Sequence, residues 1–362
     1  MEKLRTSVVG LGYLGSVYGR VLKELPESEL VAVHTRNNKV LNDISTELGV
    51  EGYDDEAAML KRSDSQVVFI ATPQGAHLRN TVTALKAGNH VYCTKPMATT
   101  LGEADQMIAM SKKTRKKLEI GFHYRFAPHI QRIREVIISG EIGRVASTLS
   151  TIQQYRGADY WSQGQWRAKK GVAGGGVLMT NYSHDLDFIQ WFLGKVDWVS
   201  GYVDTLVQPV EVEDYASATM KFKSGAVSSF NLSTASWASN SPRLEVYGTK
   251  GAISLTDKKD ASWKSLGTTL YVFRSGTWEE EKIEQDKGIE ERFAGRLPPW
   301  TVPPTGLASV HSFFNHFSDF LQRIINHRKN SVDGTEGRKS LEIATAIYLS
   351  SRKGRRIDLP LR

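Results

Sequence analysis

The chain has 362 residues, of which 40% are hydrophobic and 24% are charged, as in a globular protein large enough for two domains. Its apolar runs are far shorter than the roughly 18 residues of a membrane-spanning helix, and an apolar strand pattern begins too close to Met1 for a signal peptide. Cys93 is the only cysteine, which excludes an internal disulfide. We therefore expect a cytoplasmic protein with no membrane partner.

The formal net charge of +8 raises the question of a nucleic-acid partner. The densest basic run, KKTRKK at 112–117, falls at the expected end of a helix, where cations interact favourably with the helix dipole. No aromatic platform or DNA-binding motif accompanies this run, and the Cys and His spacings of metal sites are absent. We expect neither nucleic acid nor metal as a ligand, whereas an anionic small molecule would suit the basic surface.

In the first 120 residues, short apolar segments alternate with helical patterns. The predicted strands are 7–10, 30–34, 67–71, 90–93 and 118–122. The predicted helices are 13–25, 39–48, 76–87 and 101–113. This alternation is typical of a doubly wound parallel sheet in an α/β fold.

After about residue 125 the pattern changes to short alternating segments separated by turn residues. We predict strands of a large antiparallel sheet at 216–222, 226–232 and 244–247, preceded by helices at 128–139 and 180–193. Residues 298–304, PPWTVPP, hold four of the eleven prolines and predict an irregular loop. A helix at 337–351 and an extended tail at 356–361 complete the predicted elements.

Residues 8–19, VVGLGYLGSVYG, place three glycines between a predicted strand and a predicted helix. In this context GxGxxG is a dinucleotide-binding motif: Gly10 permits a tight turn, Gly12 lets a pyrophosphate approach the backbone, and Gly15 lets the helix pack closely. The alternative is a strand end whose glycines serve packing alone. The predicted cofactor contacts here are Gly10, Leu11, Gly12, Tyr13, Leu14 and Gly15.

The end of the second predicted strand reads VAVHTRNNK and bears on the choice of cofactor. Sites for NAD usually have an acidic residue there, which binds the ribose 2′-hydroxyl. Thr35, Arg36 and Asn37 instead offer hydroxyl, guanidinium and amide groups that suit a 2′-phosphate. We therefore predict NADP(H) as the preferred cofactor, with NAD as the alternative.

Residues 171–192, GVAGGGVLMTNYSHDLDFIQWF, place His184 and Asp187 in a mostly apolar helical pattern. One interpretation is a core histidine with a polar neighbour, since buried polar groups normally find partners. The other is a functional histidine in a pocket. The residues alone leave both open.

Further segments, taken in chain order, resemble one family. IATPQGAH at 70–77 has a Thr-Pro pair and a histidine, and VYCTKPMATT at 91–100 has a Lys-Pro pair after a strand. The glycine-rich segment before His184 and VDGTEGRKSLEIATAIYLSS at 332–351 complete the set. This set is similar to the glucose–fructose oxidoreductase/inositol dehydrogenase (Gfo/Idh/MocA) family over nearly the whole chain.

The resemblance implies a Rossmann domain with a parallel sheet at 1–123 and an α/β domain with a large, mainly antiparallel open sheet at 124–362. The C-terminal tail would pack back on the first domain, and the open sheet face would form a homo-oligomer, either a dimer or a tetramer. The implied activity is nicotinamide-dependent oxidation or reduction of a sugar, cyclitol or related polyol.

The resemblance also implies catalytic roles. Lys95 would contact the nicotinamide ribose and the substrate hydroxyl, and His184 would be the acid/base. Thr180 stands where the family usually has an aspartate; on a helix it would share a face with His184 and orient its ring. Asp187 would either compensate for that carboxylate or accept a structural N–H bond. Thr94 replaces the glutamate of the family's Glu-Lys-Pro motif.

The remaining implied contacts fall into two groups. The further cofactor contacts are Thr72, Pro73, Gln74, His77, Thr94, Lys95 and Pro96. The substrate contacts are Lys95, His123, Arg125, Tyr155, Trp166, Arg167, Tyr182 and His184. Residues 155–170 would form an aromatic wall for a sugar ring, although aromatic side chains anchor loops equally often.

Three functions fit these observations. The first is an NADP(H)-dependent sugar or polyol dehydrogenase. The second is a glycosidase on the same fold, which would retain its cofactor through oxidation, elimination and reduction. The third is a sugar or cofactor sensor without chemistry, against which the presence of Lys95 and His184 argues.

Overall fold

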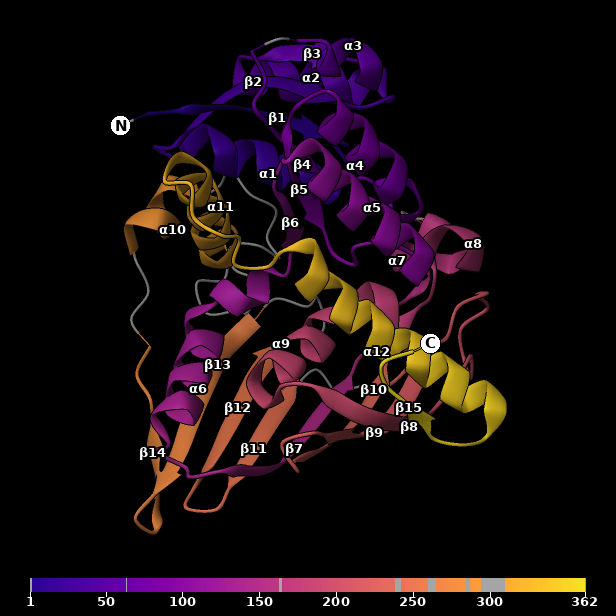
Figure 1. The fold of residues 1–362 in the computed structure, drawn as a ribbon, viewed down its shortest axis with the longest axis vertical. Coiled ribbons are helices and arrows are strands. Elements are labelled where there is room, and N and C mark those ends of the chain that lie inside the picture. Colours follow the sequence, from indigo (N-terminus) through magenta and orange to yellow (C-terminus); the bar gives the residue numbers. More distant parts are fainter. Residues whose placement is uncertain are drawn as a thin grey trace. The chain divides into compact units, whose positions relative to one another are not determined.

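The computed structural model describes residues 2–62, 64–162, 165–237, 242–259, 265–283, 287–293 and 310–361 (Figure 1). The chain forms two compact units. The first contains Met1–His123 and Phe313–Arg338, and the second contains Tyr124–Ser312 and Lys339–Arg362. The segment from Phe313 to Arg338 thus belongs to the first unit, contrary to the prediction of a single second domain over 124–362. The predicted proline loop at 298–304 lies outside the described residues.

The first unit is built on a parallel sheet of six strands in the order β3-β2-β1-β4-β5-β6. Their bounds are β1 Leu4–Val9, β2 Ser28–His34, β3 Glu51–Tyr53, β4 Val67–Ile70, β5 His90–Thr94 and β6 Leu118–Gly121. All five predicted strands are present, and the doubly wound Rossmann sheet is confirmed. Strand β3 escaped prediction because its three residues carry no apolar run.

The helices of the first unit are α1 Tyr13–Glu24, α2 Asn38–Leu48, α3 Glu56–Leu60, α4 His77–Lys86 and α5 Leu101–Thr114, with the short turn η1 Gln74–Ala76. Helix α5 ends at Thr114, and Arg115 has a positive φ of 56°. The basic run at 112–117 is therefore a helix end, as predicted. Helix α11 (Val310–Ile325) adds Phe313 and Phe317 to this core, where both rings contact Tyr18.

The second unit is built on a nine-stranded sheet in the order β14-β13-β12-β11-β7-β10-β9-β8-β15. Among the described strands of this sheet, only β7 and β10 pair in parallel, so the predicted mainly antiparallel sheet is confirmed. The bounds are β7 Val145–Gln153, β8 Val196–Asp204, β9 Tyr215–Phe222, β10 Val227–Ser233, β11 Arg243–Gly248, β12 Ala252–Lys259, β13 Ser265–Arg274, β14 Thr277–Glu280 and β15 Ile357–Asp358.

The sheet of the second unit has one buried face and one partly exposed face. In β9, Ala216, Ala218, Met220 and Phe222 are buried, whereas the residues between them are half-buried. The helices and turns are η2 His123–Phe126, α6 Pro128–Ser139, α7 Ala158–Ser162, η3 Gln165–Ala168, α8 Lys170–Ala173, η4 Val177–Asn181, α9 Ser183–Leu193, α10 Lys287–Phe293 and α12 Gly334–Lys353, whose first residues belong to the first unit. None of the described helices is long and apolar enough to cross a membrane.

The C-terminal tail pairs within the second unit. Strand β15 adds antiparallel to β8, and the Leu359 amide donates to the Asp197 carbonyl at 2.9 Å. Further along β8, the amides of Gly201 and Val203 donate to serine hydroxyls of α12. The tail thus pairs with an edge of the second unit's sheet, whose unpaired backbone groups need partners, and its predicted packing on the first domain stays a prediction.

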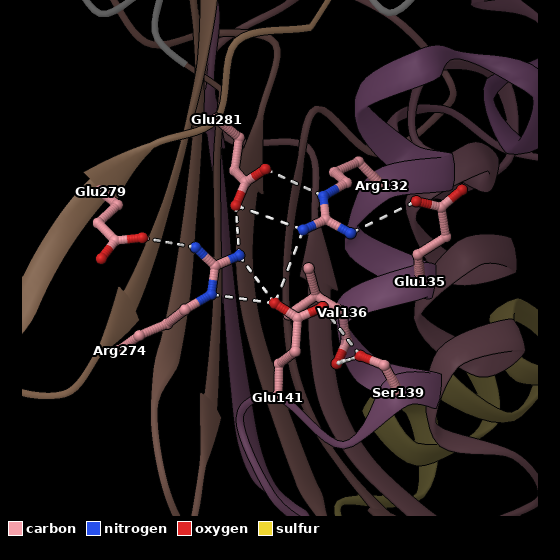
Figure 2. Close-up of polar contacts among 8 residues, drawn as sticks. All are labelled: Arg132, Glu135, Val136, Ser139, Glu141, Arg274, Glu279 and Glu281. Atoms are coloured by element: carbon pink, nitrogen blue, oxygen red, sulfur yellow. Dashed lines mark hydrogen bonds and ion pairs between the residues drawn. The ribbon is translucent and has the colours of Figure 1, made fainter.

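A network of charged side chains joins α6 to strands β13 and β14 (Figure 2). Arg132 on α6 contacts Glu281 at 3.0 Å, and Arg274 on β13 contacts Glu141 and Glu279, each at 2.8 Å. The Arg132 and Arg274 guanidinium groups hold the pKa of Glu281 below its ordinary value. The network fastens α6, which packs against α9.

Candidate active site

At two positions of the glycine motif in the first unit, close packing leaves room for glycine alone. Gly10 has a φ of +93°, and a Cβ there would lie 2.8 Å from the Thr72 side chain. A Cβ on Gly15 would lie 1.7 Å from the Gly10 carbonyl oxygen, inside any allowed contact. Beside Gly12, by contrast, no atom lies within 4 Å of the same position. The turn is therefore closed around Gly10 and Gly15 and open at Gly12.

The open side of Gly12 fits a pyrophosphate. Gly12 is the N-cap of α1, with no side-chain cap and no acidic residue in the first turn. The amide N–H groups of a first helical turn need acceptors, and phosphate oxygens serve that purpose well. Leu11 is buried in the core, whereas Tyr13 is 53% exposed. Residues 10–15 thus fit a dinucleotide through their backbone.

The turn after β2 contains one exposed cation, Arg36. The Asn37 side chain caps α2 by accepting from the Val40 amide at 3.2 Å, and Thr35 Oγ1 accepts from the Asn37 amide. Two of the three predicted phosphate donors thus also shape the turn. Arg36 is left as the group best suited to a 2′-phosphate.

His77 connects two of the predicted cofactor loops. Its Nδ1 lies 2.9 Å from the Pro96 carbonyl oxygen, and its Nε2 lies 2.8 Å from the Thr72 carbonyl oxygen. Burial lowers the pKa of His77. Both ring nitrogens thus face backbone carbonyls, and the contact of His77 with a cofactor stays a prediction. The histidine positions the loops on either side of it.

Lys95 follows β5 directly, and its peptide bond to Pro96 is cis. The preceding residue, Thr94, turns its hydroxyl toward the core, where it accepts from the Tyr18 hydroxyl at 3.1 Å. The Thr94 side chain thus contacts α1, and a contact of Thr94 with the cofactor stays a prediction. The Thr94 backbone remains in the loop that leads to Lys95.

His123 is buried beside Lys95 in the first unit. Its ring stacks on Phe313 at a centroid distance of 4.0 Å. Burial first, and then the charge of Lys95, hold the pKa of His123 well below its ordinary value. A neutral imidazole next to this ammonium can accept a hydrogen bond from it or from a hydroxyl group.

The segment before His184 is not the regular helix that its periodicity predicts. Residues 177–181 form the π-turn η4, and α9 begins only at Ser183. Thr180 therefore does not lie one turn before His184 on a shared helix, and its hydroxyl donates to the Gly175 carbonyl at 3.0 Å. The regular helix predicted over both residues is therefore interrupted between them, and a role of Thr180 in orienting His184 stays a prediction.

The cause of this irregular turn is the packing of the preceding glycines against Glu213. The Glu213 carboxylate accepts from the amides of Gly176 and Leu178 at 2.8 and 3.0 Å. A Cβ on Gly176 would lie 2.0 Å from the Glu213 carbonyl oxygen, and one on Gly175 would lie 2.1 Å from the Tyr348 hydroxyl. These contacts fix the backbone that leads into α9.

Arg125 and Asp187 form a buried bidentate ion pair within the second unit. Arg125 Nε and Nη2 lie 2.6 and 2.7 Å from the two Asp187 carboxylate oxygens. The guanidinium also lies 5.0 Å from the ring centroid of Trp191. Arg125 thus has a structural role in the second unit, and its contact with a substrate stays a prediction. Of the two roles considered for Asp187, the structure shows the structural acceptor.

The aromatic partner of His184 was not predicted from the sequence. Tyr124 in η2 stacks on the imidazole, with ring centroids 3.9 Å apart and planes inclined by 8°. His184 itself is 3% exposed. Tyr124 and Arg125 are neighbours in η2, whereas His184 and Asp187 are three residues apart in α9. This spacing is compatible with the two contacts but does not predict them.

The predicted substrate wall is largely a small core of its own. Trp161 packs with Ala173 and Val212, and Tyr160 and Trp166 lie against them. The Arg167 guanidinium lies 4.9 Å from the Tyr160 centroid and 5.0 Å from that of Trp166. Trp166 thus packs its loop against this small core, and the Arg167 guanidinium lies over the rings of Tyr160 and Trp166.

Two further predicted substrate residues lie elsewhere in the second unit. Tyr155 stacks on Trp237 at 3.6 Å, and Trp237 is 70% exposed. Tyr182 is buried, and burial raises the pKa of its hydroxyl well above the ordinary value. That hydroxyl donates a long hydrogen bond to the Ser233 carbonyl at 3.5 Å.

Among the described residues, no three His, Cys, Asp or Glu side chains form a metal-binding group.

Both units match one family. Residues 4–122 match the oxidoreductase family with an NAD-binding Rossmann fold, and residues 130–254 match the GFO/IDH/MocA C-terminal domain. These features define a nicotinamide-binding oxidoreductase with two domains. The chain belongs to the Gfo/Idh/MocA oxidoreductase family.

Individual relatives share the fold at low identity. The levoglucosan dehydrogenase of Pseudarthrobacter phenanthrenivorans is 24% identical, over 99% of this chain and 99% of its own. The myo-inositol 2-dehydrogenase of Thermotoga maritima is 28% identical, over 69% of this chain and 74% of its own. The WlbA dehydrogenase of Bordetella pertussis, in complex with NADH and UDP-GlcNAcA, has a TM-score of 0.81 at 24% identity and covers 100% of both chains.

Proposed function

We propose that this chain is an NADP(H)-dependent oxidoreductase that acts on a secondary hydroxyl or keto group of a sugar, cyclitol or sugar derivative. The observation that carries the proposal is the retention of Lys95 and His184 in a chain whose two domains both match the family. The names of the relatives, levoglucosan dehydrogenase and myo-inositol 2-dehydrogenase, support this substrate class.

In the proposed mechanism, the bound nicotinamide supplies the hydride acceptor or donor. During oxidation, a ring nitrogen of His184 accepts the proton of the substrate hydroxyl, which an imidazole can do near neutral pH. The Lys95 ammonium stabilises the negative charge that develops on that oxygen. Reduction returns the same proton from His184 to the alkoxide oxygen.

The cofactor loops support the nicotinamide in this proposal. Residues 10–15 bind the pyrophosphate through their backbone, and Thr72, Gln74 and Pro96 border the ribose in the loops that His77 connects. Arg36 binds the 2′-phosphate of NADP(H), because the turn that carries it contains no carboxylate. The NADH in the WlbA complex of B. pertussis makes NAD the alternative to be tested.

The test is a steady-state screen of pyranoses, uronates and inositols with NADP+ and NAD+. We expect turnover of a sugar or cyclitol with a preference for NADP+, and Arg36→Asp should narrow or reverse that preference. Lys95→Met should lower kcat by roughly 10²–10⁴-fold, the usual contribution of a positioned charge or acid/base. Preference for NAD+ in the wild-type protein would contradict the role of Arg36.

The alternatives give different results in the same screen. Cleavage of a glycoside without net change in a retained cofactor would indicate the glycosidase. Cofactor binding without turnover of any substrate would indicate the sensor. We also propose a homo-oligomer formed through the partly exposed face of the nine-stranded sheet, and light scattering of the purified chain measures its size.

A further inference from the structure

The stack of Tyr124 on His184 places an aromatic face where a positive charge would form. The two rings are nearly parallel, at 3.9 Å and 8°. The face of an aromatic ring carries negative electrostatic potential and attracts a cation placed over it, most strongly when water is excluded. Because His184 is 3% exposed, little water competes for this contact.

A second contact holds the first in place. Arg125 follows Tyr124 in η2, and Asp187 lies one turn after His184 in α9. Their side chains are 3% and 1% exposed, and the two bonds of 2.6 and 2.7 Å fix the guanidinium in the plane of the carboxylate. Since positions i and i+3 of a helix share a face, ring stack and ion pair together set the position of η2 on α9.

Other charged and titratable groups lie near His184, and two of them are held by contacts with other side chains. The titratable and charged side chains on η2, α6 and α9 are His123, Tyr124, Arg125, His129, Arg132, Arg134, Glu135, Asp185 and Asp187. Arg156, Tyr160 and Tyr182 belong to the same surroundings. Asp187 is neutralised by Arg125, and Arg134 lies over Trp191 at 4.0 Å. The Thr180 hydroxyl, four residues before His184 in the sequence, donates to the Gly175 carbonyl.

We propose that the ring face of Tyr124, fixed by the Arg125–Asp187 pair, supports the imidazolium form of His184. The inference rests on the proposed function, in which His184 takes up the substrate proton. Tyr124 is therefore a positioning residue that acts through His184. Its hydroxyl group is not needed for this role, since the electrostatic attraction comes from the ring.

The experiment compares Tyr124→Leu with Tyr124→Phe in the full-length protein. Loss of the ring should lower the pKa of His184, and with it the acidic limb of kcat/KM for alcohol oxidation, by about 0.5 to 1.5 pH units. Tyr124→Phe should leave both unchanged. The His184 resonance, assigned with a His184→Gln sample, is titrated by NMR after labelling of the histidines. Phe192→Leu is the matched control, because its ring contacts are with Phe188 and Trp191 on the same helix.

The outcomes separate the inference from the proposed function. If the NMR titration of His184 shifts in Tyr124→Leu while the kinetic limb stays fixed, the ring support is upheld and His184 is not the base. If the NMR titration is unmoved, or moves equally in Tyr124→Phe or Phe192→Leu, the inference is overturned. Should Tyr124→Leu not fold, pentafluorophenylalanine at position 124 keeps a ring of similar size and reverses its quadrupole, so the same downward shift is expected.

Discussion

The described part of each unit contains a buried acid–base pair, and the two pairs differ in how they can lose their charge. In the first unit, Glu119 on β6 and His316 on α11 are fully buried, with His316 Nε2 3.0 Å from a carboxylate oxygen. Burial raises the pKa of Glu119 to about 8, so a proton can neutralise it. In the second unit, Arg125 and Asp187 are almost as buried, but a guanidinium does not deprotonate in proteins. That pair stays ionic.

The difference shows where fixed geometry is needed. A pair that can exchange one proton tolerates a change of charge without rearranging its neighbours. A bidentate ionic pair fixes two atoms on each side and resists rotation. The ionic pair is the one that lies beside His184, the proposed base, whereas the Glu119–His316 pair fastens α11 to the first unit.

The largest effect is expected from breaking the ionic pair on one side. Asp187→Ala leaves the Arg125 charge buried without its carboxylate, which typically lowers the free energy of unfolding by about 3–5 kcal/mol. Urea denaturation measures this loss. Replacing both partners, as in Arg125→Met with Asp187→Leu, removes both charges and should lower the stability by much less. Equal losses in the single and double variants would show that the charge is not the cause.

A smaller effect is expected at Gly12 in the first unit, where the proposed pyrophosphate contact depends on open space beside the backbone and not on a side chain. Gly12→Ala fills the open side of the turn, so NADPH affinity should fall by about tenfold or more, equivalent to about 1.4 kcal/mol. Its melting temperature without cofactor should stay near that of the wild type, because no atom lies within 4 Å of the new Cβ.

The control for this variant is Gly102→Ala on α5, where the surroundings are equally open. It should bind NADPH as the wild type does, and the exchange of a helical glycine for alanine should stabilise the protein slightly. Fluorescence titration of NADPH distinguishes the two variants. Unchanged affinity in Gly12→Ala would mean that the pyrophosphate binds elsewhere.

An effect that depends on pH is expected from the pair that can lose its charge. Because the folded-state pKa of Glu119 is raised from 4.5 to about 8, the unfolded chain binds fewer protons between these values. The stability of the wild type should therefore be fully present below about pH 4.5 and fall as the pH rises toward 8. Glu119→Gln should remove that part of the slope, as urea denaturation at several pH values would show. Equal slopes in both proteins would place the proton on His316 and make the two pairs alike.

The sequence was sufficient for features that local patterns determine. Buried parallel strands are continuous apolar runs, so β4 (Val67–Ile70) could be found, and GxGxxG is a local spacing whose turn follows from glycine geometry. The partners of Arg125 and Tyr124 could not be found, since about sixty residues separate each from its contact and only tertiary packing joins them. The π-turn before His184 was hidden because its apolar spacing continues that of a regular helix.

The aromatic core of the first unit has a consequence for synthesis of the chain on the ribosome. Phe69 and Tyr92 are surrounded by Phe317 and Phe320, which lie more than two hundred residues later in the chain. All 189 residues of Tyr124–Ser312 are translated before these rings emerge. The Rossmann sheet, although it is made first, therefore cannot complete its core until most of the chain has been translated. A fragment that stops at His123 would leave this apolar surface open to aggregation.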